Sequence, residues 1–391
     1  MTRKKISSSP FQEKNLFFIM RIFVLIRSFF PFALGFLSFS FFSPHSFSWG
    51  GRGHQAICES AVFLVQNPEL KKFLTFRPHF MGHLCNVPDI YWKSLPASVA
   101  QQGSPTHYLD MEFLQHLPDD KKTNFAELEK ILTGTKPLAN KPSIKSVNMD
   151  VGSVWWRANQ FLQLASNLNA DFTKNPPPSN RKEDFDDEYP FNKTTFSFMT
   201  MIGLLGHFVG DNSQPLHLSV DYDAYDAGHG GLHSYFEEDM VAQFDANLVQ
   251  LITDKAREMK KKHDRGQSKI SFLMSTDPIL QMKALSEISF SELPALLKAD
   301  RVIQKSTIKE DQGMQIKTPA QRNPASQEFP RFKNMIINQM ARSSLLLATF
   351  WDKAFQNAGS PLISKYKAYK YPFTPDYIAP DYVSEPKKPT K

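Results

Sequence analysis

The chain has 391 residues, which is long enough for one large domain or two ordinary ones. Its formal net charge of +7 comes from 46 basic and 39 acidic residues, but residues 1–48 hold six of the basic and one of the acidic residues. Without that segment 40 basic and 38 acidic residues remain, a net charge of +2. The sequence pI near 9.1 is therefore poor support for nucleic-acid binding.

A secretory signal peptide is predicted for residues 1–48. Basic residues up to Arg27 precede an uncharged stretch rich in Phe, Leu and Ser, and Ser46-Phe47-Ser48 has the small-x-small form of a cleavage site. The basic region is long for a signal peptide and Met20 is a more usual start, so the true start is either Met1 or Met20. An uncleaved membrane anchor is the alternative. We expect export, to the periplasm or out of the cell.

An all-α fold, a mostly helical single domain, is predicted for residues 49–370. Helical periodicity recurs along the chain, whereas the alternation typical of β-strands is scarce. The predicted helices are Gln55–Gln66, Phe125–Leu132, Val147–Leu168, Thr194–Asp211, His233–Lys262, Pro278–Leu297 and Pro330–Gln356. Residues 171–193 and 298–329 are interpreted as loop insertions. The Pro/Lys-rich tail, residues 371–391, is expected to be extended or disordered.

Three potential metal ligands lie within eleven residues: His207, Asp211 and His217. The apolar run before them predicts a buried helix, on which His207 and Asp211 share one face because they are four residues apart. Pro215 ends that helix, so the turned chain can bring His217 back to the same place. The segment therefore predicts a metal site.

A second pair repeats this spacing, with His233 and Glu237 four residues apart after a Gly-rich turn. His54, Asp89 and His107 stand upstream in short distinctive contexts; any one of them alone is more often a structural residue than a ligand. Together with the two pairs they form a set of nitrogen and oxygen ligands that suits zinc.

This order of ligands resembles the superfamily of zinc-dependent phospholipases C and fungal-type single-strand nucleases. The resemblance spans Trp49 to Glu237 and implies a mostly helical domain with a trinuclear zinc cleft. In that superfamily the mature chain begins with a Trp whose free amine and carbonyl bind a zinc ion. Here cleavage after Ser48 would expose Trp49, followed by His54 in a Trp-Gly-x-x-Gly-His sequence.

The family pattern implies three zinc ions per chain. Asp89, His107, His207 and Asp211 would hold the first ion. His217, His233 and Glu237 would hold the second. Trp49 and His54 would hold the third together with Asp211, which would bridge. Asp89 is the candidate for orienting the attacking water, and a role as ligand alone is the alternative.

Cys58 and Cys85 are the only cysteines, each four residues from a candidate ligand. An exported protein favours one disulfide between them; two buried free thiols or additional zinc ligands are the alternatives.

Paired zinc ions suit hydrolysis of a phosphodiester by an activated water. His54 and His107 stand in nuclease-like contexts, whereas Glu237 resembles the phospholipase branch and the basic residue usual three positions after Asp89 is replaced by Trp92. Tyr91, Trp92 and Tyr108 could stack on bases, with core packing as the alternative.

We expect a zinc-dependent hydrolase that cleaves single-stranded nucleic acid or 3′-nucleotides. The alternatives are a phospholipase C acting on phospholipid headgroups and a zinc-binding protein with a relic site. We expect a monomer without a stable protein partner.

Overall fold

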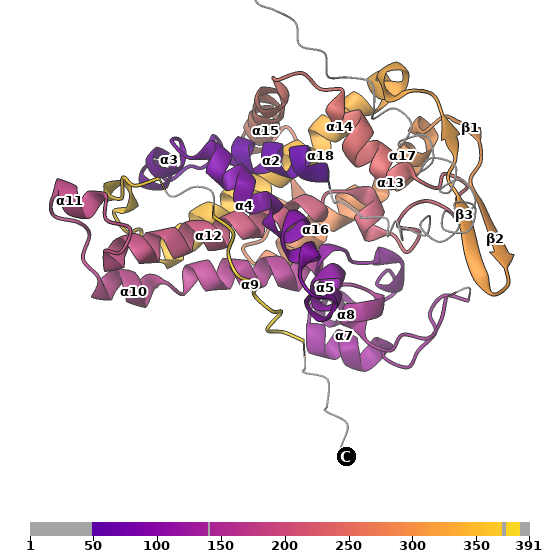
Figure 1. The fold of residues 1–391 in the computed structure, drawn as a ribbon, viewed down its shortest axis with the longest axis horizontal. Helices are drawn as coiled ribbons and strands as arrows, with labels where there is room; N and C mark the ends of the chain where they lie inside the picture. The colour runs from indigo at the N-terminus through magenta and orange to yellow at the C-terminus, as the bar shows by residue number, and fades with distance from the viewer. Residues whose placement is uncertain (1–48, 140, 370–372, 384–391) are drawn as a thin grey trace, which may run out of the picture. The chain divides into compact units, whose positions relative to one another are not determined.

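Helices make up most of the chain in the computed structural model, which describes residues 49–139, 141–369 and 373–383 (Figure 1). The prediction of a mostly helical fold is confirmed. No helix within these ranges is long and apolar enough to cross a membrane. The predicted signal peptide lies outside the described residues.

Seventeen α-helices, mostly short, alternate with turns and 3₁₀ helices along the described chain, and the strands are confined to one segment near the C-terminal end. The α-helices are α2 (Gly50–Val62), α3 (Pro68–Leu74), α4 (Pro78–Ile90), α5 (Ala97–Gly103), α6 (Asp119–Lys122), α7 (Phe125–Leu132), α8 (Val147–Asp150), α9 (Val154–Ser166), α10 (Asn169–Lys174), α11 (Arg181–Asp184), α12 (Pro190–Asp211), α13 (Leu232–Ser234), α14 (Met240–Ala242), α15 (Leu248–Asp264), α16 (Pro278–Ser291), α17 (Leu293–Ala299) and α18 (Ala325–Asn357). A π-helix, η5, spans Tyr235–Asp239. The strands are β1 (Val302–Gln304), β2 (Thr307–Asp311), β3 (Met314–Thr318) and β4 (Gln321–Arg322). Short 3₁₀ helices include η1 (Trp92–Ser94), η2 (Ser104–His107) and η4 (Pro215–Leu218).

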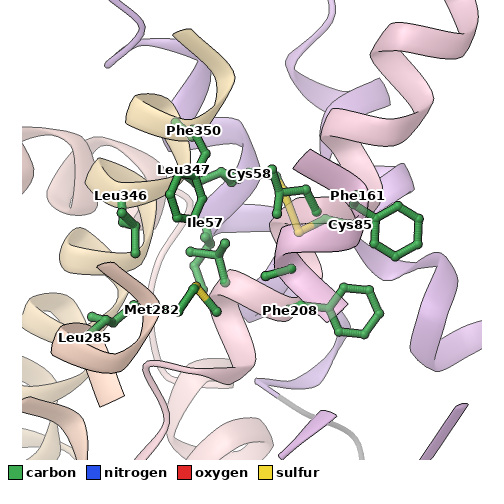
Figure 2. Packing of buried hydrophobic residues seen from close by; sticks show 14 of the residues in the cluster. Ile57, Cys58, Cys85, Phe161, Phe208, Met282, Leu285, Leu346, Leu347 and Phe350 are labelled. Atoms are coloured by element: carbon green, nitrogen blue, oxygen red, sulfur yellow. A yellow bond between two sulfur atoms is a disulfide. The ribbon is translucent and has the colours of Figure 1, made fainter. Parts of the chain in front are cut away.

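The long helix α12 forms the centre of the fold. Its apolar residues are buried over most of its length, which fits a helix without a polar face. In Figure 1 it runs beside α9, and it also packs on α2, α4 and α18. Figure 2 shows Phe161 of α9 and Phe208 of α12 on one side of the Cys58–Cys85 disulfide, with Leu347 of α18 on the other.

Two glycines of α12 allow α2 and α4 to approach closely. A methyl group added at Gly206 would collide with Cys58 Sγ, and one at Gly210 would lie 2.8 Å from His54 Nδ1. The disulfide that joins α2 to α4 therefore packs directly on α12. As a result the helices that carry His54, Asp89 and His207 are held against one another.

Several predicted helices are interrupted in the structure. The predicted Val147–Leu168 helix divides into α8 and α9, because Gly152 has a φ of +94° that no helix residue adopts. The predicted Pro278–Leu297 helix divides before Pro294, and the predicted His233–Lys262 helix contains a π-helix and a break before α15. The helix α4, which contains Pro88 near its end, was not predicted.

The two insertions differ in structure. Residues 171–193 are mostly exposed but include α11 and the starts or ends of α10 and α12, so they are not a plain loop. Residues 298–329 contain all the strands of the described chain, as the antiparallel pairs β1–β4 and β2–β3. The β2–β3 hairpin is exposed throughout.

The part of the predicted tail that the structure describes, residues 373–383, contains no helix or strand and is extended. It is nevertheless anchored: the indole of Trp92 donates a hydrogen bond to Pro375 O at 3.1 Å, and Gln160 donates one to Ala379 O at 2.7 Å. This stretch packs against the domain and is not disordered.

Candidate metal centre

Eight of the nine predicted ligands lie in two buried clusters. The large cluster consists of His54 on α2, Asp89 on α4, His107 on η2, and His207 and Asp211 on α12. The small cluster consists of His217 on η4, His233 on α13 and Glu237 on η5. Three groups within them have ligand atoms within 4.8 Å of one another: His54, His207 and Asp211; Asp89, His107 and His207; and His217, His233 and Glu237.

The large cluster gathers around the end of α12. His107 Nδ1 lies 2.9 Å from His207 Nε2 and 3.0 Å from Asp211 Oδ2. Asp89 Oδ1 lies 3.4 Å from His207 Nε2 and 3.5 Å from His107 Nδ1. The other oxygen of Asp211, Oδ1, faces His54 Nε2 at 3.3 Å. Asp211 thus presents one oxygen to each side of the cluster.

The tautomer of His207 follows from its partners. Its Nδ1 lies 2.8 Å from Cys85 O, and because a carbonyl only accepts hydrogen bonds, Nδ1 carries the proton. The lone pair of Nε2 then faces Asp89 Oδ1 and Asp211 Oδ2, two oxygens that also carry lone pairs. These atoms repel one another unless a metal ion lies between them or Nε2 also takes up a proton.

The same argument applies to the small cluster. His217 Nδ1 lies 2.8 Å from His107 O, and His233 Nδ1 lies 3.1 Å from Tyr222 O, so both rings donate to carbonyls. Their Nε2 lone pairs face each other at 3.2 Å, and Glu237 Oε1 lies 3.2 Å from one and 2.8 Å from the other. Oε2 of Glu237 is buried without a hydrogen-bond partner among the described residues.

These separations test whether a metal ion fits. Nitrogen and oxygen ligands about 2.0–2.1 Å from a tetrahedral metal lie about 3.3–3.4 Å from one another. Five pairs of ligand atoms from Asp89, His107, His207 and Asp211 are 2.9 to 3.5 Å apart. A fixed imidazole tautomer, with its second nitrogen on a carbonyl, is also the usual arrangement around metals. The residues present fit a bound metal at both clusters.

The large cluster is braced by the disulfide. Cys58 lies one turn after His54 on α2, and Cys85 lies one turn before Asp89 on α4. The structure contains the Cys58–Cys85 disulfide, which confirms that prediction. Because Cys85 O fixes the tautomer of His207, the disulfide tethers the residue that orients a ligand.

The small cluster is braced by loops. Asp223 Oδ1 accepts a hydrogen bond from His233 N at 3.0 Å. Arg322 of β4 donates to Gly230 O at 3.1 Å, just before α13, and makes two 2.9 Å bonds to Asp300. The insertion 298–329 therefore holds the turn that precedes His233.

The carboxylates of the large cluster stay ionised despite burial. Burial alone raises the pKa of Asp89, but Lys93 and His207 outweigh it and hold the pKa well below the usual value. Burial also tends to raise the pKa of Asp211. His207, His107 and His54 lower it more strongly, so the pKa of Asp211 is lowered as well. Anionic oxygens are the form that binds a metal.

The histidines of the large cluster respond in opposite directions. Burial, with the charge of Lys93 adding to it, lowers the pKa of His107 to about 4. Burial also lowers the pKa of His54. Burial also tends to lower the pKa of His207, but Asp211 and Asp89 raise that pKa above the ordinary value.

In the small cluster, burial raises the pKa of Glu237 while His233 and His217 act more strongly in the other direction, and the result is about 2. Burial lowers the pKa of His217, but Glu237 and Asp211 outweigh it, so the pKa is raised.

Trp49 lies beside the large cluster, at the start of α2. Its buried indole donates hydrogen bonds to Gly210 O at 2.9 Å and Ser213 Oγ at 3.2 Å. These contacts fix the residue against the end of α12 next to Asp211. The role of the Trp49 amine as a ligand stays a prediction.

A cavity of about 350 Å³ opens onto both clusters, because its walls include His107 and His217. The other lining residues are Lys93, Ser104, Tyr108, Asp110, Val220 and Tyr222. Burial and the neighbouring Glu112 raise the pKa of Asp110 well above the ordinary value.

Lys93 was not identified from the sequence; only the absence at Trp92 of the basic residue usual in the nuclease branch was noted. Lys93 lies four residues after Asp89, and its Nζ is 2.6 Å from Asp89 Oδ1. The i,i+4 spacing from Asp89 was the available signal. Trp92 itself is buried, with its indole on Pro375 O, so it packs in the core and does not face the cavity.

Comparison with models of known protein families found no match, and a search of curated proteins found none.

Proposed function

We propose that the chain is an exported zinc-dependent phosphodiesterase of the nuclease type, similar to the fungal-type single-strand nucleases, with three zinc ions. The large cluster would hold two ions and the small cluster one. Imidazole nitrogens and carboxylate oxygens without thiolates suit zinc at sites of this geometry. The observation that carries the proposal is the cavity whose walls include a ligand of each cluster together with the cation Lys93.

Zinc ions at these positions would polarise a phosphate and activate a water. The remaining work falls to the chain itself. Lys93 offers a positive charge to a phosphate oxygen at the cavity wall. Asp89, in contact with Lys93, would orient the water or serve as a ligand alone.

The cavity walls favour a nucleotide over a lipid. Tyr108 and Tyr222 present aromatic rings to a space of about 350 Å³, which is in the range of small-molecule sites. Stacking of a base on such a ring contributes roughly 1–3 kcal/mol. Asp110 adds carboxyl oxygens that can accept hydrogen bonds from a base edge.

A phospholipase C remains the second candidate, for one specific reason. Three exposed apolar side chains surround the end of α4 next to Lys93: Ile90 is 46% exposed, Tyr91 37% and Leu95 36%. Such side chains could rest on a lipid surface beside the cavity.

The test is one panel assay on zinc-loaded chain that begins at Trp49. Single-stranded DNA, RNA, 3′-nucleotides and phosphatidylcholine are compared at one pH. We expect cleavage of the nucleic-acid substrates, and loss of most of it in Lys93→Gln but not in the surface control Lys255→Gln. Cleavage of phosphatidylcholine with every oligonucleotide intact would replace the proposal with the second candidate.

The amine of Trp49 is proposed as a ligand of the third zinc ion, which would make signal cleavage an activation step. An amide nitrogen has no available lone pair, whereas a terminal amine with a pKa of about 7.7–8.0 can bind when deprotonated. A chain beginning at Trp49 is compared with one carrying Gly-Ser before it. Equal zinc content and equal activity in the two chains would exclude the amine.

A further inference from the structure

Residues 373–383, which we call the strap, cross α4 and α9 as an extended chain held by side chains of the domain. Trp92 and Gln160 donate to its carbonyls, and Arg157 donates to Ile378 O at 2.5 Å. At its far end, the hydroxyl of Tyr382 lies 3.0 Å from Ser153 Oγ. The donors come from α9 and from the turn after α4, the helix that carries Asp89.

Arg157 is the unusual member of this set. Its side chain is fully buried and forms no ion pair with any described residue. The guanidinium instead contacts Gln160 Oε1 at 2.5 Å, Ile378 O, and the rings of Phe161 at 4.7 Å and Phe208 at 5.4 Å. A buried cation is costly unless such partners surround it, so the strap supplies part of what keeps Arg157 inside.

Arg157 lies directly behind the large cluster. Phe208, one of the rings on its guanidinium, follows His207 in α12, and its centroid is 5.4 Å from that of His107. A small void of about 10 Å³ has Arg157, His107 and Lys93 in its walls. The same void is bounded by Tyr377 of the strap.

Tyr377 separates two segments that carry ligands. Its ring meets the ring of Trp92 edge to face at 5.3 Å, three residues after Asp89. On the other side, a methyl group added at Gly103 would lie 3.6 Å from Tyr377 Cε2, four residues before His107. The ring therefore fixes the distance between the end of α4 and η2.

We infer that the strap is a positioning element of the metal centre: through Tyr377 and Arg157 it holds Asp89 and His107 at the separation that a shared metal requires. The strap itself contributes no ligand. The strap acts on metal affinity at the large cluster, and this effect does not depend on which phosphodiester the enzyme cleaves.

The test uses Arg157→Met and Tyr377→Ala in the chain that begins at Trp49, with Co²⁺ as the probe followed by its visible absorption. We expect Co²⁺ binding at the large cluster to weaken roughly 10–100-fold, as for other groups that orient ligands. Binding at the small cluster should be unchanged. The absorption of Co²⁺ at the small cluster is assigned with His217→Ala, which should remove that absorption and leave the rest. Arg157→Lys, which keeps the charge and a donor for Ile378 O, should restore most of the affinity.

Arg77→Met is the matched control. Arg77 is also a buried arginine that donates to carbonyls of the C-terminal segment, Tyr366 O at 3.1 Å and Ala368 O at 3.2 Å. It lies at the opposite end of α4, about 18 Å from Asp89 along the helix. Its loss should lower Tm without changing Co²⁺ binding.

If Arg157→Met or Tyr377→Ala does not fold, Trp92→Phe removes the indole donor to Pro375 O and keeps a smaller aromatic ring. Weaker Co²⁺ binding at the large cluster in that variant supports the inference. Co²⁺ titrations that superimpose on the unsubstituted protein, with Tm lowered as in Arg77→Met, would show that the strap only stabilises the fold.

Discussion

The two clusters reach similar ligand geometry from different scaffolds. The large cluster stands on α2, α4, α12 and η2; the three α-helices pack on one another, and a disulfide joins α2 to α4. The small cluster stands on a 3₁₀ turn, a three-residue helix and a π-helix, and its outer support is the insertion 298–329. Core packing therefore positions one metal site and loop hydrogen bonds position the other, so different substitutions should disrupt each site.

The largest effect is expected for Asp211→Asn. Its two oxygens face opposite sides of the large cluster, so loss of the charge should release two zinc ions and lower activity by at least about 100-fold, beyond the roughly 10–100-fold cost of substitutions that only orient ligands. Glu237→Gln should release only the ion of the small cluster. Elemental analysis after dialysis measures both. Equal losses in the two variants would mean that Asp211 does not bridge.

Removing the disulfide with Cys58→Ala and Cys85→Ala should act on the large cluster alone. Closing a chain segment with a separation of 27 residues is worth about 3–4 kcal/mol in the free energy of unfolding. Metal affinity at the large cluster should fall about tenfold, because Cys85 O orients His207. Urea unfolding and Co²⁺ titration measure the two effects.

Val62→Ala serves as the control for the disulfide, since it is a buried residue of α2 without a ligand contact. It should lower stability and leave Co²⁺ binding as it is. Weaker Co²⁺ binding at the small cluster in the double cysteine variant would contradict the claim that the two clusters depend on separate scaffolds.

Arg322→Met should act on the small cluster alone. The variant loses the donors that hold His229 O and Gly230 O before α13, and we expect about tenfold weaker metal binding there. Arg331→Met is matched, because Arg331 also donates to main-chain carbonyls, Ala299 O and Lys298 O, but not near a ligand. A loss of metal from the large cluster in Arg322→Met would contradict the account.

The ligand pairs could be predicted from the sequence, whereas the contacts that support them could not. The i,i+4 pairs His207/Asp211 and His233/Glu237 need only local helix geometry, and the structure brings each pair together. The contact of Lys93 in η1 with Asp89 depends on α4 continuing through Pro88, which local propensity argues against. The support from Arg322 and from the strap depended on contacts between residues far apart in the chain, which no local pattern carries.

The smallest effect is expected from pH. In the metal-free protein the raised pKa values of His207 and His217 stabilise the fold below about pH 6.5, and this stability is lost as pH rises through the folded-state values. His107, with its pKa near 4, acts oppositely: its contribution is present above about pH 6.5 and is lost as pH falls towards 4. Metal-free protein should therefore lose stability from pH 6.5 upward.

Metal-loaded protein should gain stability over the same range above pH 6.5, because fewer protons compete for the ligands. Thermal melts of the two forms at several pH values measure these slopes. Parallel slopes in the loaded and metal-free protein would show that the histidines do not bind the metal.

The most direct test of the metal centre is an anomalous difference map recorded at the zinc absorption edge from crystals of chain that begins at Trp49. The account predicts three peaks: two in the large cluster, on either side of Asp211, and one between His217, His233 and Glu237. A map without zinc peaks at these residues would contradict it.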